Sequence, residues 1–154
     1  MSSTFHVKHY ILFYMKQAEK QGKKNQIGAW GEEIACRYLK NQGFEILEVN
    51  YLKKWGEIDI VSRETAVNDP KVRFVEVKTV SYETKKDLEK AVSYGTWRPE
   101  ENVHYKKIQR LNRAIESWIM ENEYDGEWEI DVIAVRMVPR EKYATVKYIQ
   151  NVVV

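Results

Sequence analysis

The stretches GEIDIV (Gly56–Val61) and RFVEVK (Arg73–Lys78) insert charged residues into runs that otherwise have the apolar composition of β-strands. Charged and apolar residues alternate in both stretches, and successive side chains of a strand point to opposite faces of its sheet. We therefore expect Glu57 and Asp59 to share one face, with the two neighbouring isoleucines on the other. The pattern predicts two strands that carry their charges on one side.

The second stretch places a carboxylate and a lysine on the same face. By the same alternation, Glu76 and Lys78 project together, with Val75 and Val77 behind them. If the two strands pair as a hairpin, both sets of charges meet at one end of the sheet. Carboxylate oxygens are the ligands that Mg²⁺ prefers, and a nearby lysine can orient or deprotonate an attacking water. Half-exposed antiparallel strands alternate in this way without any site, so alternation alone leaves both interpretations open.

The segments around these strands indicate a domain built of helices and strands. The turn-forming run TAVNDP (Thr65–Pro70) predicts that strands over 56–63 and 71–80 form a hairpin. A helix over about 26–42 ends at Gly43, a residue typical of a C-terminal cap. The other expected elements are, in chain order, a helix over 4–20, a strand over 44–51, a connection over 52–56, a mobile polar loop containing Gly95 and Pro99, a helix over about 101–122, and closing strands over about 128–138 and 143–153. This order predicts an α/β or α+β sheet domain with helices on at least one face.

Length and composition restrict the class of protein. A chain of 154 residues, 44% hydrophobic and 31% charged, is expected to fold as a globular domain with a substantial core. The 25 basic and 23 acidic residues give a net charge of +2, which neither requires nor excludes a nucleic-acid partner. A single cysteine, Cys36, excludes an internal disulfide and a zinc site with several thiolates. No stretch is apolar for long enough to span a membrane, and the run over 10–15 is too short for a secretory signal, so we expect a cytoplasmic protein.

Several segments, taken in order along the chain, resemble one protein family. They are GAWGEEIACRYL (Gly28–Leu39), GFEIL, GEIDIV, FVEVKT, KIQRLNRA (Lys107–Ala114) and EIDVIAV (Glu129–Val135). Over roughly 25–150 the sequence resembles the YraN-type family of small bacterial proteins, which is placed in the PD-(D/E)XK nuclease superfamily and is Holliday-junction-resolvase-like. The resemblance implies a restriction-endonuclease-like α/β core with a mixed central sheet flanked by helices.

The resemblance also implies roles for individual residues. Asp59 and Glu76 would bind the metal ion, Mg²⁺ or Mn²⁺ in its place, and Lys78 would complete the catalytic set. Glu32 would be the helix carboxylate that reaches the metal directly or through water, although a solvated acid in the first turns of a helix looks the same in sequence. The chain departs from the family at Val80, where a basic residue is usual, and in its longer hairpin turn. Both differences concern substrate contacts.

Basic residues on the helix over about 101–122 are the predicted nucleic-acid contacts. Lys106, Arg110 and Arg113 follow one another at i, i+4 and i+7 and so lie along one face of the helix. Lys107 begins the family's Lys-x-x-x-Leu pattern and belongs to the same predicted contact set. Such a face can bind a phosphate backbone, and the solvated back of a helix has the same composition.

Three functions follow from these observations. The leading expectation is a metal-dependent endonuclease that hydrolyses phosphodiester bonds in nucleic acid, with DNA as the expected substrate. The alternative is a non-catalytic nucleic-acid-binding or scaffold protein that retains the nuclease fold. The third is an interaction module, in which an N-terminal helical extension and linker over 1–24 docks a partner or forms a homodimer beside a nuclease-like domain over 25–154.

Overall fold

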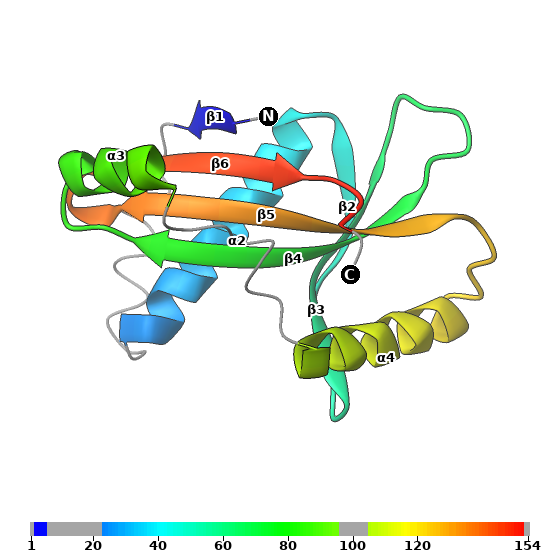
Figure 1. Ribbon diagram of the computed structural model, residues 1–154. Helices are drawn as coiled ribbons and strands as arrows, with labels where there is room; N and C mark the ends of the chain where they lie inside the picture. Colours follow the sequence, from blue (N-terminus) through cyan, green and yellow to red (C-terminus); the bar gives the residue numbers. More distant parts are fainter. Residues whose placement is uncertain (1, 6–22, 96–104, 153–154) are drawn as a thin grey trace.

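The computed structural model describes residues 2–5, 23–95 and 105–152, and in these residues six strands form one mixed sheet (Figure 1). The strands are β1 (Ser2–Phe5), β2 (Phe44–Lys53), β3 (Gly56–Glu64), β4 (Val72–Ser81), β5 (Trp128–Val138) and β6 (Tyr143–Ile149). The helices are α2 (Lys23–Asn41), α3 (Lys85–Tyr94) and α4 (Tyr105–Glu121), and a short 3-10 helix, η2, spans Pro139–Glu141. The order across the sheet is β1-β6-β5-β4-β3-β2.

The directions of the strands follow from the connections between them. β2, β3 and β4 form an antiparallel meander, and β5 and β6 also pair antiparallel. β4 and β5 are parallel, so the chain must cross over between them, and α4 lies on this crossover. Glu76 and Lys78 therefore lie on a central strand of the sheet.

Helices α2 and α4 cover opposite faces of this sheet (Figure 1). On one face α2 packs on a cluster that includes Ile34, Leu39, Ile60, Val75, Ile133 and Val146. On the other face α4 packs on a cluster that includes Val61, Phe74, Leu111, Ile115 and Trp118. Removing these large apolar side chains from water on both faces is the main force that holds the layers together. A mixed sheet between helices, consistent with a restriction-endonuclease-like core, confirms the predicted fold class.

Most of the predicted elements are confirmed, with small changes in their bounds. β5 has the predicted bounds, and β3 and β4 pair as the predicted hairpin. Helix α2 ends at Asn41, and Gly43 adopts the left-handed φ of 87° expected of a residue that ends a helix. β2 extends into the predicted connection as far as Lys53, and β6 ends at Ile149. None of the described helices has the length and hydropathy needed to cross a lipid bilayer.

Helix α3 corrects the expectation of a loop between β4 and α4. Thr84 Oγ1 accepts a hydrogen bond from Asp87 N at 3.1 Å and so caps the start of the helix, and Gly95 ends it with a φ of 60°. The side chain of Leu88, a residue of this helix, is buried. The rest of the expected loop, residues 96–104, lies outside the described residues.

The N-terminal segment also differs from the prediction. Residues 2–5 form β1, which pairs with β6 in the register Ser2↔Lys147, whereas the sequence predicted a helix that begins at Thr4. Thr4 and Phe5 precede the apolar residues of helical spacing, and pairing with the edge of β6 satisfies their backbone groups. The remainder of the predicted helix, 6–22, lies outside the described residues.

Candidate metal and nucleic-acid site

The residues of the predicted catalytic set lie where β3 and β4 separate. In the ladder between the two strands, the pair nearest this point is Ile60↔Val75. The next positions are Asp59 on β3 and Glu76 on β4. Here Asp59 Oδ2 accepts a hydrogen bond from Val77 N at 2.8 Å. A side-chain oxygen thus takes the place of a backbone acceptor and fixes the Asp59 carboxylate against β4.

The alternation of β3 reverses at Asp59, contrary to the expectation from the sequence. Ile58 packs in the cluster under α4, whereas Ile60 packs in the cluster under α2, so the two isoleucines do not share a face. The partner strand is irregular at the same level, where Asn50 has a left-handed φ of 51°. The β2–β3 register omits the Asn50–Asp59 position, although it pairs the residues on either side of it. This local irregularity turns Asp59 and Glu57 toward different cavities.

Two cavities flank β3 at this point. The α2-side cavity, of about 140 Å³, is lined by Ala29, Glu32, Glu33, Cys36, Val49, Asn50, Asp59 and Ile60. The α4-side cavity, of about 390 Å³, is lined by Glu57, Glu76, Lys106, Lys107, Arg110 and Leu111. Two of the predicted acids, Asp59 and Glu32, therefore share the smaller cavity, and Glu76 lines the larger one together with basic residues of α4.

The carboxylates of this region destabilise one another in their charged forms. Burial, followed by the negative charge of Glu76, raises the pKa of Asp59 to about 8, although the hydrogen bond from Val77 opposes the shift. Burial also raises the pKa of Glu32, with further contributions from Glu57 and Glu76 and an opposing hydrogen bond from Asn50. In the described residues Asp59 forms no ion pair that would offset its charge. A bound cation would relieve this repulsion.

Two lysines offset the charge of Glu76, which is only 5% exposed. Lys107 Nζ lies 2.5 Å and Lys78 Nζ 3.5 Å from the same oxygen, Oε1. Burial and the adjacent Lys107 lower the pKa of Lys78, and these effects outweigh the attraction of Glu76. Burial also acts to lower the pKa of Lys107, but its hydrogen bonds to Glu76 and Lys78 raise it overall. Lys78 is therefore the lysine that loses its proton more readily than an ordinary lysine.

The donor set suits a metal ion that completes its shell with water and substrate. In the described part of the chain, no three histidine, cysteine, aspartate or glutamate side chains lie close enough to hold an ion among themselves. Glu32, Asp59 and Glu76 therefore do not form a ready-made cage. Mg²⁺ usually takes only one or two carboxylates and keeps several waters besides substrate phosphate oxygens. The anchored Asp59 and the adjacent Glu76 fit that requirement.

Two glycines allow the helices to approach the site. A Cβ on Gly31 would lie 1.8 Å from Thr79 Oγ1, so α2 rests directly on β4 beside Glu32. A Cβ on Gly56 would lie 1.9 Å from the carbonyl oxygen of Arg110, so α4 rests directly on the β2–β3 turn. Any larger residue at these two positions would push the helices away from the sheet.

The basic residues of α4 divide into two kinds. Lys106, Arg110 and Arg113 are exposed, as expected for a helix surface, and the first two line the α4-side cavity. Lys107 is half-buried and points to Glu76, a contact that the sequence analysis did not predict. It also missed Asn50, the hydrogen-bond partner of Glu32, although an asparagine inside a strand is a signal of irregular backbone.

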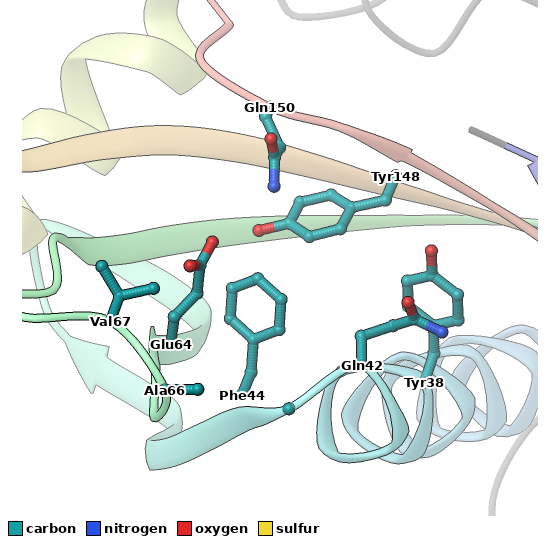
Figure 2. Close-up of a pocket in the computed structure, with 9 residues that line it drawn as sticks. Tyr38, Gln42, Phe44, Glu64, Ala66, Val67, Tyr148 and Gln150 are labelled. Carbon is teal, nitrogen blue, oxygen red and sulfur yellow. The ribbon is translucent and has the colours of Figure 1, made fainter.

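Another cavity, of about 370 Å³, lies beyond the C-terminal end of α2 and contains none of the predicted residues (Figure 2). Figure 2 shows the ring of Phe44 below the Tyr148 hydroxyl and the Glu64 carboxylate. These polar groups already have protein partners, because Tyr148 donates to Asp131 and Glu64 pairs with Arg73 at 3.2 Å. The Tyr148 hydroxyl and the Glu64 carboxylate are therefore already engaged by the protein.

Comparison with known proteins agrees with the resemblance seen in the sequence. Residues 31–135 match the model of a family described as Uncharacterised protein family UPF0102. A UPF0102 protein of Alkaliphilus oremlandii is 36% identical over 129 residues, which span 82% of this chain and 96% of the relative. A UPF0102 protein of Nocardia farcinica is 36% identical over 121 residues, or 77% of this chain and 82% of the relative. One of Campylobacter fetus is 36% identical over 130 residues, or 84% and 96%. The chain thus belongs to the uncharacterised protein family UPF0102, consistent with its YraN-type features.

Proposed function

We propose that this protein is a metal-dependent nuclease that hydrolyses phosphodiester bonds in nucleic acid, with DNA as the substrate. The observation that supports the proposal most is the arrangement at the point where β3 and β4 separate. Asp59 Oδ2 is fixed by Val77 N at 2.8 Å, and Lys78 Nζ lies 3.5 Å from Glu76 Oε1. The half-buried carboxylate of Asp59, the buried carboxylate of Glu76 and a lysine with a lowered pKa are the groups that metal-assisted hydrolysis requires.

Asp59 and Glu76 are the residues that would hold the ion, Mg²⁺ or Mn²⁺ in its place. When bound, the ion offsets the charge that develops on the phosphate and lowers the pKa of water beside it. Glu32 shares a cavity with Asp59 and would reach the ion directly or through a water molecule. The hydrogen bond from Val77 holds the Asp59 carboxylate in one orientation, which reduces the reorganisation needed on binding.

Lys78 would receive the proton of the attacking water. Its ammonium is destabilised first by burial and then by Lys107, so more of the neutral amine is present near neutral pH than for an ordinary lysine. The proton moves from the water oxygen to Nζ as the oxygen attacks phosphorus, the P–O bond to the leaving oxygen breaks, and the leaving oxygen takes a proton from solvent water. The activity should therefore increase with pH as Lys78 loses its proton.

The exposed cations of α4 would bind the phosphate backbone. Lys106 and Arg110 line the cavity that also contains Glu76, and Arg113 continues the same helix face. Each phosphate that they contact releases counterions, so the affinity for nucleic acid should decrease steeply as salt increases.

The test is the cleavage of labelled single-stranded, duplex and branched DNA with Mg²⁺ or Mn²⁺ at several pH values. Asp59→Asn and Lys78→Met should each reduce the cleavage rate by about 10²-fold or more. The matched control is Lys71→Met, because Lys71 lies at the other end of the sheet and its ion pairs within the described residues are long, at 3.9 and 4.0 Å. Cleavage that persists in both site variants would refute the proposal.

A non-catalytic nucleic-acid-binding protein is the second candidate. The observation that favours it is the absence, in the described residues, of a three-carboxylate group, together with the two lysines on Glu76. It predicts no cleavage by any form and DNA binding that survives Asp59→Asn and Lys78→Met but is weakened by substitution of Lys106 or Arg110. Filter binding at increasing salt separates the two candidates.

A further inference from the structure

We propose that Lys107 is an exchangeable counter-ion of Glu76, which leaves this carboxylate for a substrate phosphate when a metal ion binds, so that metal and nucleic acid favour each other's binding. The inference rests on the proposed nuclease function and adds a mechanism of regulation to it. It starts from a single contact, that between Lys107 Nζ and Glu76 Oε1 at 2.5 Å.

Lys107 and a metal ion would compete for the negative charge of the Glu76 carboxylate. A magnesium ion binds a carboxylate oxygen at about 2.0–2.1 Å. With the ammonium still 2.5 Å from Oε1, two cations would share one buried carboxylate. Their repulsion is strong where water is scarce. This repulsion favours movement of the ammonium away from Glu76 when the ion arrives.

Lys107, rather than Lys78, is the lysine that is able to move. The side chain of Lys107 is 42% exposed and projects from α4 into the α4-side cavity, whereas that of Lys78 is 19% exposed and lies on a central strand. The cavity, of about 390 Å³, has space for Lys107 to turn away from Glu76.

A phosphate backbone gives the displaced ammonium a new partner. The α4-side cavity is lined by Lys106, Lys107 and Arg110, with Glu57 as the other acid besides Glu76. Once Lys107 leaves Glu76, the cavity wall carries three cations that face solvent, which favours an anion in that place. Bound nucleic acid thus lowers the cost of displacing Lys107, and by linkage bound metal strengthens the binding of nucleic acid to the same extent.

The first experiment measures the binding of Mn²⁺ by calorimetry in the absence of nucleic acid. Lys107→Met should bind Mn²⁺ about tenfold more tightly than the wild type, because no ammonium has to be displaced. Lys107→Gln, which keeps a polar group without the charge, should show the same gain and guards against a folding defect in the first variant. The control is Lys71→Met, which lies outside both site cavities, and its Mn²⁺ affinity should not change.

The second experiment measures the same affinity in the presence of a DNA duplex with phosphorothioate linkages that resist hydrolysis. DNA should increase the Mn²⁺ affinity of the wild type, and both Lys107 variants should lose this increase. Wild-type or weaker Mn²⁺ affinity in the Lys107 variants, or an equal effect of DNA on all forms, would overturn the inference. If DNA does not bind at all but the Lys107 variants still gain Mn²⁺ affinity, the proposed function fails and the exchange at Glu76 stands.

Discussion

At the scale of single residues, Asp59 is kept in a state that favours function over stability. Its carboxylate is half-buried near Glu76, and its pKa is raised to about 8. The folded protein therefore retains a proton that the unfolded chain releases above about pH 4. By linkage, Asp59 reduces the free energy of unfolding as the pH rises from about 4 to 8. Functional sites often retain such unfavourable charges because a bound ligand relieves the repulsion between them.

Asp59→Asn should therefore stabilise the metal-free protein at pH 8. The amide oxygen can still accept the hydrogen bond from Val77, and the buried charge is gone. We expect a gain of about 2 kcal/mol at pH 8, less than the full pKa shift because water and relaxation screen the charge, and a smaller gain at pH 5. Urea unfolding in EDTA at the two pH values measures this. A variant that is less stable than the wild type at pH 8 would contradict the raised pKa.

At the scale of elements, the position of α4 depends on one glycine of the β2–β3 turn. The carbonyl oxygen of Arg110 would lie 1.9 Å from a Cβ at Gly56, and a backbone atom cannot turn aside as a side chain can. α4 also carries Lys107 and the exposed cations, so its position affects both the core and the candidate site.

Gly56→Ala should therefore lower the free energy of unfolding by about 2 kcal/mol, because α4 must shift away from the sheet. Gly28→Ala in α2 is the matched control, since a Cβ there meets no atom within 4 Å. Alanine at that helical position should stabilise the protein by up to about 1 kcal/mol. Urea unfolding of both variants is the measurement, and equal effects would show that the approach of α4 to the turn is not limiting.

At the scale of the whole molecule, the sequence predicted the layers well and the local irregularities poorly. The fold is determined by the apolar stripes of α2 and α4 and by the alternation of apolar and charged residues in β3 and β4. These periodic patterns can be recognised in a single sequence. The left-handed Asn50 reverses the alternation at Asp59, and no periodic signal contains such a reversal. Helix α3 was missed because Gly95 and Pro99 suggested a loop, although Thr84 and Asp87 have the spacing of a helix cap.

The contact of Lys107 with Glu76 could not be predicted either, because it depends on how α4 crosses the sheet. That crossing is set by close approaches such as Gly56 against Arg110, between residues far apart in sequence. Periodicity shows which face of a helix is buried but not which strand it crosses. The sequence identifies Glu32, Asp59 and Glu76 as candidate site residues. Only the structure shows that Glu76 lines one cavity and that Glu32 and Asp59 line another.

The two ends of β4 have different roles. The beginning of the strand holds an ion-pair network that stabilises the fold, and the candidate site lies further along it. At its beginning, Arg73 pairs with Glu129 and, at 3.1 Å, with Asp131, which is fully buried. Asp131 also accepts hydrogen bonds from the Tyr148 hydroxyl and from Asn151 N, so this network ties β4, β5 and the end of β6 together. The negative charge of Asp131 is therefore offset by Arg73 and by these hydrogen bonds. The charge of Asp59 is not offset in this way, although Asp59 lies only three residues along β3 from Ser62, which pairs with Arg73.

Arg73→Met should therefore have the opposite effect to Asp59→Asn. It leaves the buried Asp131 carboxylate without its cation and should lower the free energy of unfolding by about 3–5 kcal/mol. Because Arg73 is remote from the two site cavities, Mn²⁺ affinity at a temperature where the variant is folded should equal that of the wild type. Asp59→Asn should instead lose Mn²⁺ binding while gaining stability. Calorimetry and urea unfolding on both variants measure the contrast, and a loss of Mn²⁺ binding by folded Arg73→Met would show that the two ends of the sheet act as one unit.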